Sequence, residues 1–151
     1  MKFAIIGTGI MGRVWITQCS MTGHEVHCYD DNQEILAGTV VASEKLTGKV
    51  SKKFNIDDPD CVSYAVKIIH IHEDKGAFIE AAKDCDVFLE VIFEDLKLKC
   101  TVLSEFLPQL PENVMFWSNT SSLDINPMAE AGGRPDRSII THGMNPVSYT
   151  H

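Results

Sequence analysis

The first twelve residues constrain the fold of this chain more than any other part of its sequence. Residues 2–6 form an apolar run typical of a strand, and they lead directly into the motif G-T-G-I-M-G at residues 7–12. A stretch suited to a helix, residues 10–21, follows without a break. This order of strand, glycine-rich turn and helix is the context in which G-x-G-x-x-G binds a dinucleotide. We therefore predict the phosphate turn of a βαβ nucleotide-binding unit rather than a turn without a ligand.

Each position of this turn has its own physical task. Gly7 allows the chain to turn tightly, Gly9 lets the backbone approach a pyrophosphate, and Gly12 lets the helix pack closely on the strand. Ile10 and Met11 begin the helix, whose N-terminal amides and dipole favour an anion. We expect all of these positions to form the phosphate part of a cofactor site.

The identity of the cofactor is predicted from the end of the second strand. Residues 25–29 are typical of a strand, and Asp30 follows it about 20 residues beyond the glycines, as the fingerprint requires. A carboxylate there accepts hydrogen bonds from the adenosine ribose and repels a 2′-phosphate. Asp31 adds a second negative charge, and no Arg or Lys follows closely, so NAD is favoured over NADP. A second role for Asp30, capping a helix that starts near Gln33, is compatible with ribose binding.

Strands and helices alternate along the whole sequence. Apolar strands separated by helices predict an α/β fold of the Rossmann type, a doubly wound, mainly parallel sheet with helices on both faces. At 151 residues the chain is expected to form a single domain, residues 1–151. The predicted strands are residues 2–6, 25–29, 65–71, 87–92, 114–117 and 138–141, and the predicted helices are residues 10–21, 33–46, 75–83, 95–107 and 125–131.

The net charge limits the partners that such a domain can bind. With a formal charge of −8, neither nucleic acid nor an anionic membrane surface is expected. No apolar run approaches the ~20 residues of a transmembrane helix, and a strand beginning at Lys2 leaves no room for a signal peptide. The cysteines lack metal-ligand spacing, and Cys28 and Cys85 lie in or beside apolar strands, as buried thiols do. We therefore expect a cytoplasmic protein without a bound metal.

One basic cluster stands out in this acidic chain. Lys49, Lys52 and Lys53 lie within residues 48–64, the region where the sequence pattern is least informative. The interpretation that we favour is the solvated end of a helix. The alternative is that these lysines meet the phosphates of an anionic substrate.

Small polar residues gather at the end of a later strand. Ser-Asn-Thr-Ser-Ser, residues 118–122, follows the strand at 114–117, and His142 follows the strand at 138–141. In open α/β sheets the ligand binds at this carboxyl edge of the strands. An imidazole beside a serine hydroxyl and a nicotinamide site is suited to take the proton when an alcohol is oxidised.

These motifs resemble the NAD-binding domain of the 3-hydroxyacyl-CoA dehydrogenase family over nearly the whole chain. The likeness is strongest at residues 7–12, 86–99 and 118–146, where S-N-T-S-S and H-x-x-N-P occur together. It implies reversible, NAD-dependent oxidation of the 3-hydroxy group of a 3-hydroxyacyl-CoA, a reaction of fatty acid metabolism. The implied partner is therefore a small-molecule substrate, either an acyl-CoA or a related 3-hydroxy acid.

The resemblance also implies roles for individual residues. His142 would be the general acid/base, Ser121 would hydrogen-bond the substrate oxygen, and Asn145 would help to place the substrate and the nicotinamide. Lys52 falls roughly where the family has a lysine for the phosphates of coenzyme A. The residues that would line the cofactor side are Glu94, Lys99 and Asn119.

The sequence departs from the family pattern in two places. Gly143 and Met144 stand where the family usually has two phenylalanines. The motifs G-R-V-W at residues 12–15 and N-P-V-S-Y at 145–149 are more similar to the branch of lambda-crystallin and gulonate dehydrogenase. That branch implies a free 3-hydroxy acid as substrate, or a non-catalytic NAD-binding or structural module.

The family pattern also extends beyond this sequence. The glutamate that orients the catalytic histidine in the family would lie beyond His151, where the sequence stops. The second, helical domain, which closes the active site and forms the dimer in the family, is absent from this sequence. We therefore expect the cofactor half of an enzyme, weakly active or inactive alone and homo-oligomeric when full length.

Overall fold

The computed structural model describes residues 1–143 of the chain. In this part, one sheet is formed by strands that all run parallel, in the order β3-β2-β1-β4-β5-β6. This is the strand order of dinucleotide-binding α/β domains, so the predicted fold class is confirmed. The strands are β1 (Lys2–Ile6), β2 (Glu25–Tyr29), β3 (Ile69–Ile71), β4 (Val87–Glu90), β5 (Met115–Ser118) and β6 (Ser138–Ile140).

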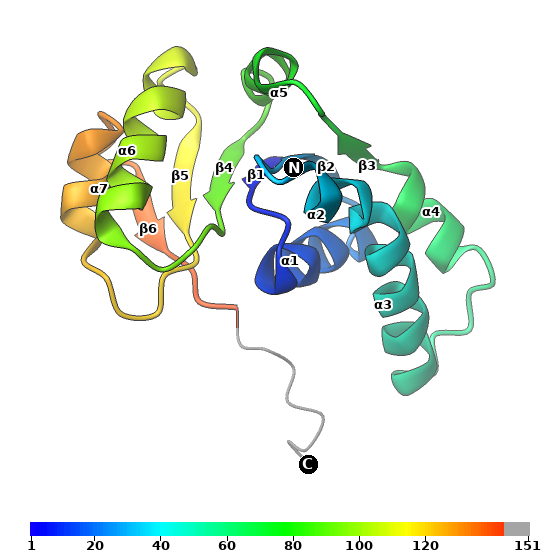
Figure 1. Ribbon diagram of the computed structural model, residues 1–151. Coiled ribbons are helices and arrows are strands. Elements are labelled where there is room, and N and C mark those ends of the chain that lie inside the picture. The colour runs from blue at the N-terminus through cyan, green and yellow to red at the C-terminus, as the bar shows by residue number, and fades with distance from the viewer. Residues whose placement is uncertain (144–151) are drawn as a thin grey trace.

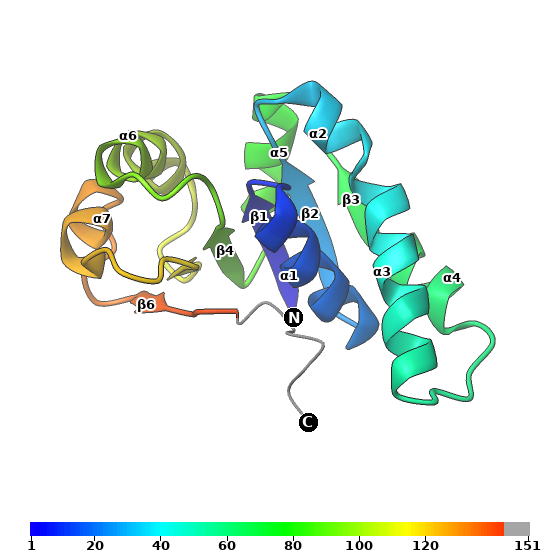
Figure 2. The same cartoon turned by 60° about the horizontal axis from the view of Figure 1, so that its bottom comes forward.

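Helices cover both faces of the sheet (Figures 1 and 2). Helices α1, α3 and α4 pack together on the side of β2 and β3, while α6 and α7 lie beside each other at the opposite end of the sheet. The helices are α1 (Ile10–Met21), α2 (Gln33–Ala37), α3 (Thr39–Lys53), α4 (Cys61–Lys67), α5 (Lys75–Ala82), α6 (Leu96–Phe106) and α7 (Ile125–Ala131), with a 3₁₀ turn η1 (Leu107–Gln109) after α6.

The apolar alternation of the strands produces two cores, one on each face. Ala4 and Ile6 of β1 point into the core that is closed by α5, α6 and α7. Phe3 and Ile5 of the same strand point into the core that is closed by α1. All four side chains are buried, as expected for a central strand of a parallel sheet, so the two cores hold the glycine turn after β1 between packed layers.

Two predicted elements differ from the structure. Residues 65–71 were predicted to be one strand, but Ala65 belongs to α4, and only Ile69–Ile71 pair with β2. The run is apolar because α4 also buries one face, with Ala65 fully buried, and a short apolar run does not distinguish helix from strand. The predicted helix at 33–46 is two helices, because the chain ends α2 at Gly38 and starts α3 there.

The cysteines are free thiols, and most of them are buried. Burial in the apolar layers raises the pKa of Cys19, Cys28 and Cys85 to about 12, which makes these thiols poor nucleophiles. The prediction that Cys28 and Cys85 are buried is confirmed.

Across the part of the chain that the structure describes, no helix has the length and apolar character needed to cross a membrane.

Candidate active site

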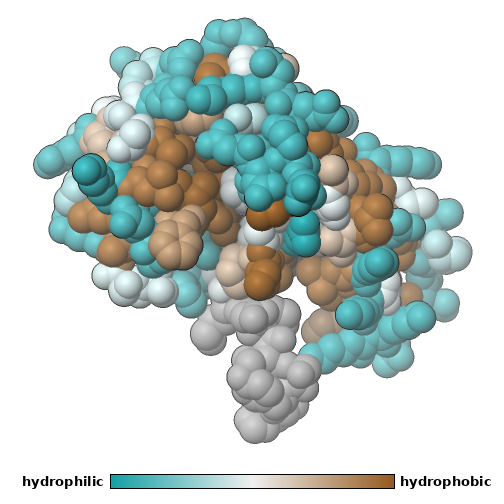
Figure 3. Space-filling model, viewed as in Figure 1, coloured by the Kyte–Doolittle hydropathy of each residue, from teal (hydrophilic) through white to brown (hydrophobic). Residues whose placement is uncertain are grey.

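A cleft of about 660 Å³ opens at the carboxyl edge of the sheet. It lies beyond the ends of β1 and β4, where the strand order reverses, which is the place at which open α/β sheets bind ligands. The turn after β1, Asp30 after β2, and segments that follow β4, β5 and β6 contribute to its wall. Hydrophobic residues gather over α1 and α6 on the face seen in Figure 3, and the cleft wall includes Ile10, Phe93 and Leu98.

The glycine turn has the close contacts that its sequence predicts. Gly7 adopts a φ of +94°, and a Cβ there would lie 2.6 Å from the carbonyl oxygen of Val91. A Cβ on Gly12 would lie 2.0 Å from the carbonyl oxygen of Gly7, so only glycine lets α1 approach the turn this closely. A Cβ on Gly9, by contrast, would meet nothing within 4 Å.

The start of α1 has the features of a phosphate site. Gly9 is the N-cap and provides no side-chain acceptor for the first-turn amides. Gly9, Ile10 and Met11 all line the cleft. Free space beside Gly9, together with uncapped amides of a helix N-terminus, fits a pyrophosphate at this position. The residues present therefore fit the phosphate portion of NAD.

Asp30 lies half-buried at the cleft wall and is held by the turn. Its Oδ2 accepts a hydrogen bond of 2.7 Å from the Thr8 amide, and its Oδ1 accepts one of 2.9 Å from the Asn32 amide. The side chain that caps α2 is Asn32, which accepts from the amides of Glu34 and Ile35. The suggested capping role of Asp30 is therefore wrong, and Asp30 instead lines the cleft beside the glycine turn.

Glu94 organises the polar segment that follows β5. Its Oε1 accepts hydrogen bonds from Thr120 Oγ1 and from the Ser121 amide, the latter at 3.0 Å. Burial alone would raise the pKa of Glu94, but the bonds from Thr120 and Ser121 and the nearby Lys99 charge outweigh it and lower the pKa below its ordinary value. An ionised Glu94 thus fixes the backbone that carries Ser121.

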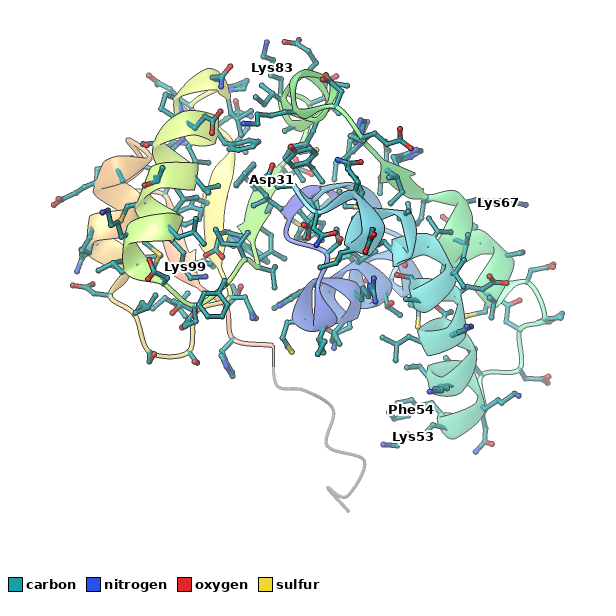
Figure 4. The ribbon with its side chains drawn as sticks, in the orientation of Figure 1. Asp31, Lys53, Phe54, Lys67, Lys83 and Lys99 are labelled. Atoms are coloured by element: carbon teal, nitrogen blue, oxygen red, sulfur yellow. The ribbon has the colours of Figure 1, made fainter. Side chains whose placement is uncertain are left out.

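A buried ion pair lies behind the wall of the cleft. Lys99 Nζ donates to Glu90 Oε1, and both side chains are almost completely excluded from solvent. Glu90 also accepts from Ser118 Oγ at 2.7 Å and from the Ile92 amide at 2.7 Å. Figure 4 shows Lys99 on α6. Its ammonium also lies 3.3 Å from Glu94 Oε2, so Lys99 ties α6 to Glu90 and Glu94 beneath the site, and Glu90 in turn is bonded to Ser118 of β5.

Trp15 on α1 holds the side chain of Asn119. Asn119 Oδ1 accepts hydrogen bonds from Trp15 Nε1 at 2.7 Å and from the Gly143 amide at 2.9 Å. Because both partners are donors, the oxygen of the amide must face them. The Nδ2 group of Asn119 then remains available as a donor, and Asn119 lines the cleft. A Cβ on Gly143 would lie 2.9 Å from Trp15 Nε1, so glycine makes room for this contact.

The sequence model of 3-hydroxyacyl-CoA dehydrogenase, NAD binding domain, matches residues 2–151. The chain belongs to the 3-hydroxyacyl-CoA dehydrogenase family. The family model also confirms NAD as the predicted cofactor.

Relatives and solved structures agree with this assignment. The chain is 36% identical to a probable 3-hydroxybutyryl-CoA dehydrogenase of Deinococcus radiodurans, covering 97% of this chain and 51% of that protein. It is 32% identical to the mitochondrial hydroxyacyl-coenzyme A dehydrogenase of Sus scrofa, over 95% of this chain and 46% of that protein. The structure of (S)-3-hydroxybutyryl-CoA dehydrogenase from Ralstonia eutropha is similar with a TM-score of 0.85 and 26% identity, covering 98% and 50%. The chain thus spans about half the length of the curated relatives it matches.

The structure brings together most of the site residues that the sequence predicts. His142 and Ser121 are both exposed and line the same cleft as the glycine turn. Gly12 and Lys99 lie behind its wall, and Asn145 is outside the described residues. The predicted residues that line the cleft are Gly7, Gly9, Ile10, Met11, Asp30, Glu94, Asn119, Ser121 and His142.

The lysine cluster lies away from this cleft. Lys52 and Lys53 form the exposed last turn of α3, where basic side chains interact favourably with the helix dipole. Figure 4 shows Lys53 and Phe54 at the far end of α3, well separated from Asp31 and Lys99. The arrangement favours a solvated helix end over a contact with the substrate.

Sequence reasoning did not find the residues that support the site. Trp15, Thr8, Glu90 and Ser118 act on other side chains rather than on a ligand. Glu90 left one signal, a carboxylate in an otherwise apolar strand nine residues before Lys99. Trp15 stood out only as part of the G-R-V-W motif, which did not reveal its contact with Asn119, and Thr8 left no signal, because the partners of both residues are distant in the sequence.

Proposed function

We propose that this domain binds NAD in the cleft and supports hydride transfer to and from the 3-hydroxy group of a 3-hydroxyacyl-CoA. The observation that carries the proposal is that one cleft contains the phosphate turn, Asp30, Ser121 and His142. The cleft thus offers an anion site, a ribose acceptor and an acid/base pair. These three parts fit a nicotinamide cofactor with an alcohol substrate beside it. The names of the family and of its relatives supply the substrate class.

In the proposed mechanism, each residue has a task that follows from its position. The first amides of α1 bind the pyrophosphate, and Asp30 accepts hydrogen bonds from the adenosine ribose. Ser121 donates to the substrate oxygen, and His142 removes the hydroxyl proton during oxidation and returns it during reduction. Asn119 donates from Nδ2 toward the nicotinamide side of the cleft. When bound, NAD supplies the redox chemistry of the reaction.

The supporting residues keep this arrangement ready before the substrate binds. Glu94 fixes the segment of Ser121 through a backbone bond of 3.0 Å. The buried pair of Glu90 and Lys99 holds the same segment to β4 and α6. Such preorganisation reduces the reorganisation that the reaction requires.

We further propose that residues 1–151 are the NAD-binding domain of a larger catalytic unit. The support is that the relatives are about twice as long as the part that this chain matches. The second part of such a unit, a helical domain, would complete the acyl-CoA pocket and orient His142. When this second domain is left out of an assay, we expect turnover to fall while NADH binding is retained.

The first experiment separates cofactor binding from chemistry. NADH is titrated into the chain, and energy transfer from Trp15 and Trp117 to the bound nicotinamide is followed. We expect saturable transfer that NAD displaces more effectively than NADP, and Asp30→Ala should narrow that difference. A wild-type chain that binds NADP as well as NAD would contradict the role of Asp30.

The second experiment tests the acid/base pair and the substrate. Oxidation of NADH by acetoacetyl-CoA and by free acetoacetate is measured. The part of the Deinococcus radiodurans relative that this chain does not match is added to each assay as a separate polypeptide. We expect turnover with the thioester, and a large loss of kcat in His142→Ala with NADH binding retained. His24→Ala is the matched control, because it also removes a histidine. His24 packs on Phe3, whose side chain lies in the core on the opposite face of the sheet from Ala4 and Ile6. Equal rates for wild type and His142→Ala would refute the acid/base role of His142. Turnover of acetoacetate but not of acetoacetyl-CoA would show that the substrate is a free 3-hydroxy acid.

A further inference from the structure

A second group of chemically active side chains lies on the sheet, away from the cleft. Glu25 and His27 are two residues apart on β2, so their side chains point to the same face. His70 on β3 is the register partner of His27 and lies beside it on that face. Glu25 is the first residue of β2, whereas the cleft lies beyond the last residue of this strand. The cofactor site therefore uses none of these three groups.

Each of the three side chains offers one ligand atom, and these atoms lie close together. Glu25 Oε1 lies 3.0 Å from His27 Nε2 and 3.7 Å from His70 Nε2. All three atoms lie within 4.8 Å of one another. Ligand atoms around a tetrahedral Zn²⁺ are about 3.3 Å apart, given bonds of about 2.0–2.1 Å. The two separations from Glu25 Oε1 are within a few tenths of an ångström of that value, and His70 must turn out of its stack on His27 for both imidazoles to face one ion.

The neighbours of these side chains determine how the group could hold a cation. His27 Nδ1 lies 3.0 Å from His72 Nε2, and this contact can hold the Nδ1 proton so that Nε2 keeps its lone pair. The ring of His70 stacks on His27 with centroids 4.8 Å apart, but its side chain is 44% exposed and can turn toward a metal. Lys2 Nζ lies 3.4 Å from Glu25 Oε2, so it contacts the carboxylate oxygen that faces away from the cluster.

We propose that Glu25, His27 and His70 bind one divalent transition-metal ion of the Zn²⁺ class. Two imidazoles and one carboxylate favour such ions over Mg²⁺ or Ca²⁺, which prefer oxygen ligands. Three protein ligands at a partly exposed position leave the remaining coordination sites to water. The ion joins β2 to the three-residue edge strand β3, so it stabilises the edge of the sheet rather than taking part in the redox reaction.

The test is a calorimetric titration of the full chain with ZnCl₂ after treatment with a chelator. We expect one Zn²⁺ per chain and a rise in the unfolding temperature with added Zn²⁺. Glu25→Gln, His27→Gln and His70→Gln should each weaken binding by at least about tenfold, and His72→Phe by about 10–100-fold. Lys2→Met should strengthen it, because a neighbouring positive charge is removed.

Controls distinguish this site from binding elsewhere. His24→Gln replaces a histidine outside the cluster and should titrate like the wild type. Saturable NADH binding in each variant shows that the chain is still folded. Co²⁺ in place of Zn²⁺ reports the ligands, because thiolates add a strong near-ultraviolet band that imidazole and carboxylate do not. A wild type that takes up no Zn²⁺, equal binding by all variants, or a thiolate band would each overturn the proposal.

Discussion

Alanine substitutions at Gly9 and Gly12 should separate two functions of the same turn. Both glycines belong to G-x-G-x-x-G, yet their surroundings differ completely. A Cβ at residue 12 would lie 2.0 Å from Gly7 O, whereas a Cβ at residue 9 would meet nothing within 4 Å. We therefore expect Gly12→Ala to disturb both the fold and cofactor binding, and Gly9→Ala to disturb cofactor binding alone.

The size of the first effect follows from that contact. Real Cβ atoms are essentially never closer than 3.0 Å to such an atom, so α1 and the turn must separate by roughly 1 Å in Gly12→Ala. Overpacking of this kind costs about 1–3 kcal/mol of folding stability. A displacement of roughly 1 Å also breaks a backbone bond to a phosphate, which is worth about 1.5–3 kcal/mol. The Kd for NADH should then rise by at least about tenfold.

Gly9→Ala is expected to weaken NADH binding without destabilising the fold. Replacing glycine by alanine at an N-cap costs less than about 1 kcal/mol, so stability should change little. The added methyl group occupies the space through which the pyrophosphate approaches, so NADH affinity should fall as strongly as in Gly12→Ala.

Two measurements on the same samples distinguish an effect on stability from an effect on NADH binding. Urea unfolding gives the stability difference, and energy transfer from Trp15 and Trp117 gives the Kd for NADH. For a chain of this size, about 1 kcal/mol corresponds to about 2–4 °C in Tm, which thermal unfolding can resolve. The reasoning is refuted if Gly12→Ala is as stable as wild type, or if Gly9→Ala binds NADH normally.

Three further predictions concern Trp15, Glu94 and the cysteines. Trp15→Phe removes one donor to Asn119, so NADH binding should weaken about tenfold with little change in Tm, and unchanged affinity would show that Asn119 does not need this contact. The lowered pKa of Glu94 means that its support for the fold is present above the ordinary carboxyl value of 4.5 and is lost as pH falls through the lowered value. Acid titration of Tm should therefore show this loss in wild type and not in Glu94→Gln, and parallel curves would contradict it. Iodoacetamide at pH 8 should modify Cys61 and Cys100 in the folded chain and, only after unfolding, Cys19, Cys28 and Cys85.

The sequence predicted elements whose signal is local. The strand–turn–helix at residues 2–21 was located correctly because glycine spacing and apolar runs are contiguous in the chain. The segment at 65–71 was not, because helix α4 and strand β3 bury similar apolar residues within a few positions of each other. A period cannot be measured over so short a run.

The same distinction separates the site residues that were predicted from those that were missed. Asp30, Ser121 and His142 were found because each follows a strand at the carboxyl edge, where topology alone brings them together. Lys99 was expected to face the cofactor but is buried with Glu90, so its contact with NAD stays a prediction. Charge in a sequence shows that a residue is special without showing whether its partner is a ligand or another side chain.

Trp15 and Gly143 show why part of the site could not be read from the chain. Each departs from the expected pattern on its own, as a large aromatic residue in α1 and a missing side chain after His142. In the structure they are one feature, because a Cβ on Gly143 would lie only 2.9 Å from the indole Nε1 of Trp15. Both then donate to the same oxygen of Asn119. A change at residue 143 must therefore be matched at residue 15, and the orientation of the Asn119 amide depends on the pair rather than on either residue alone.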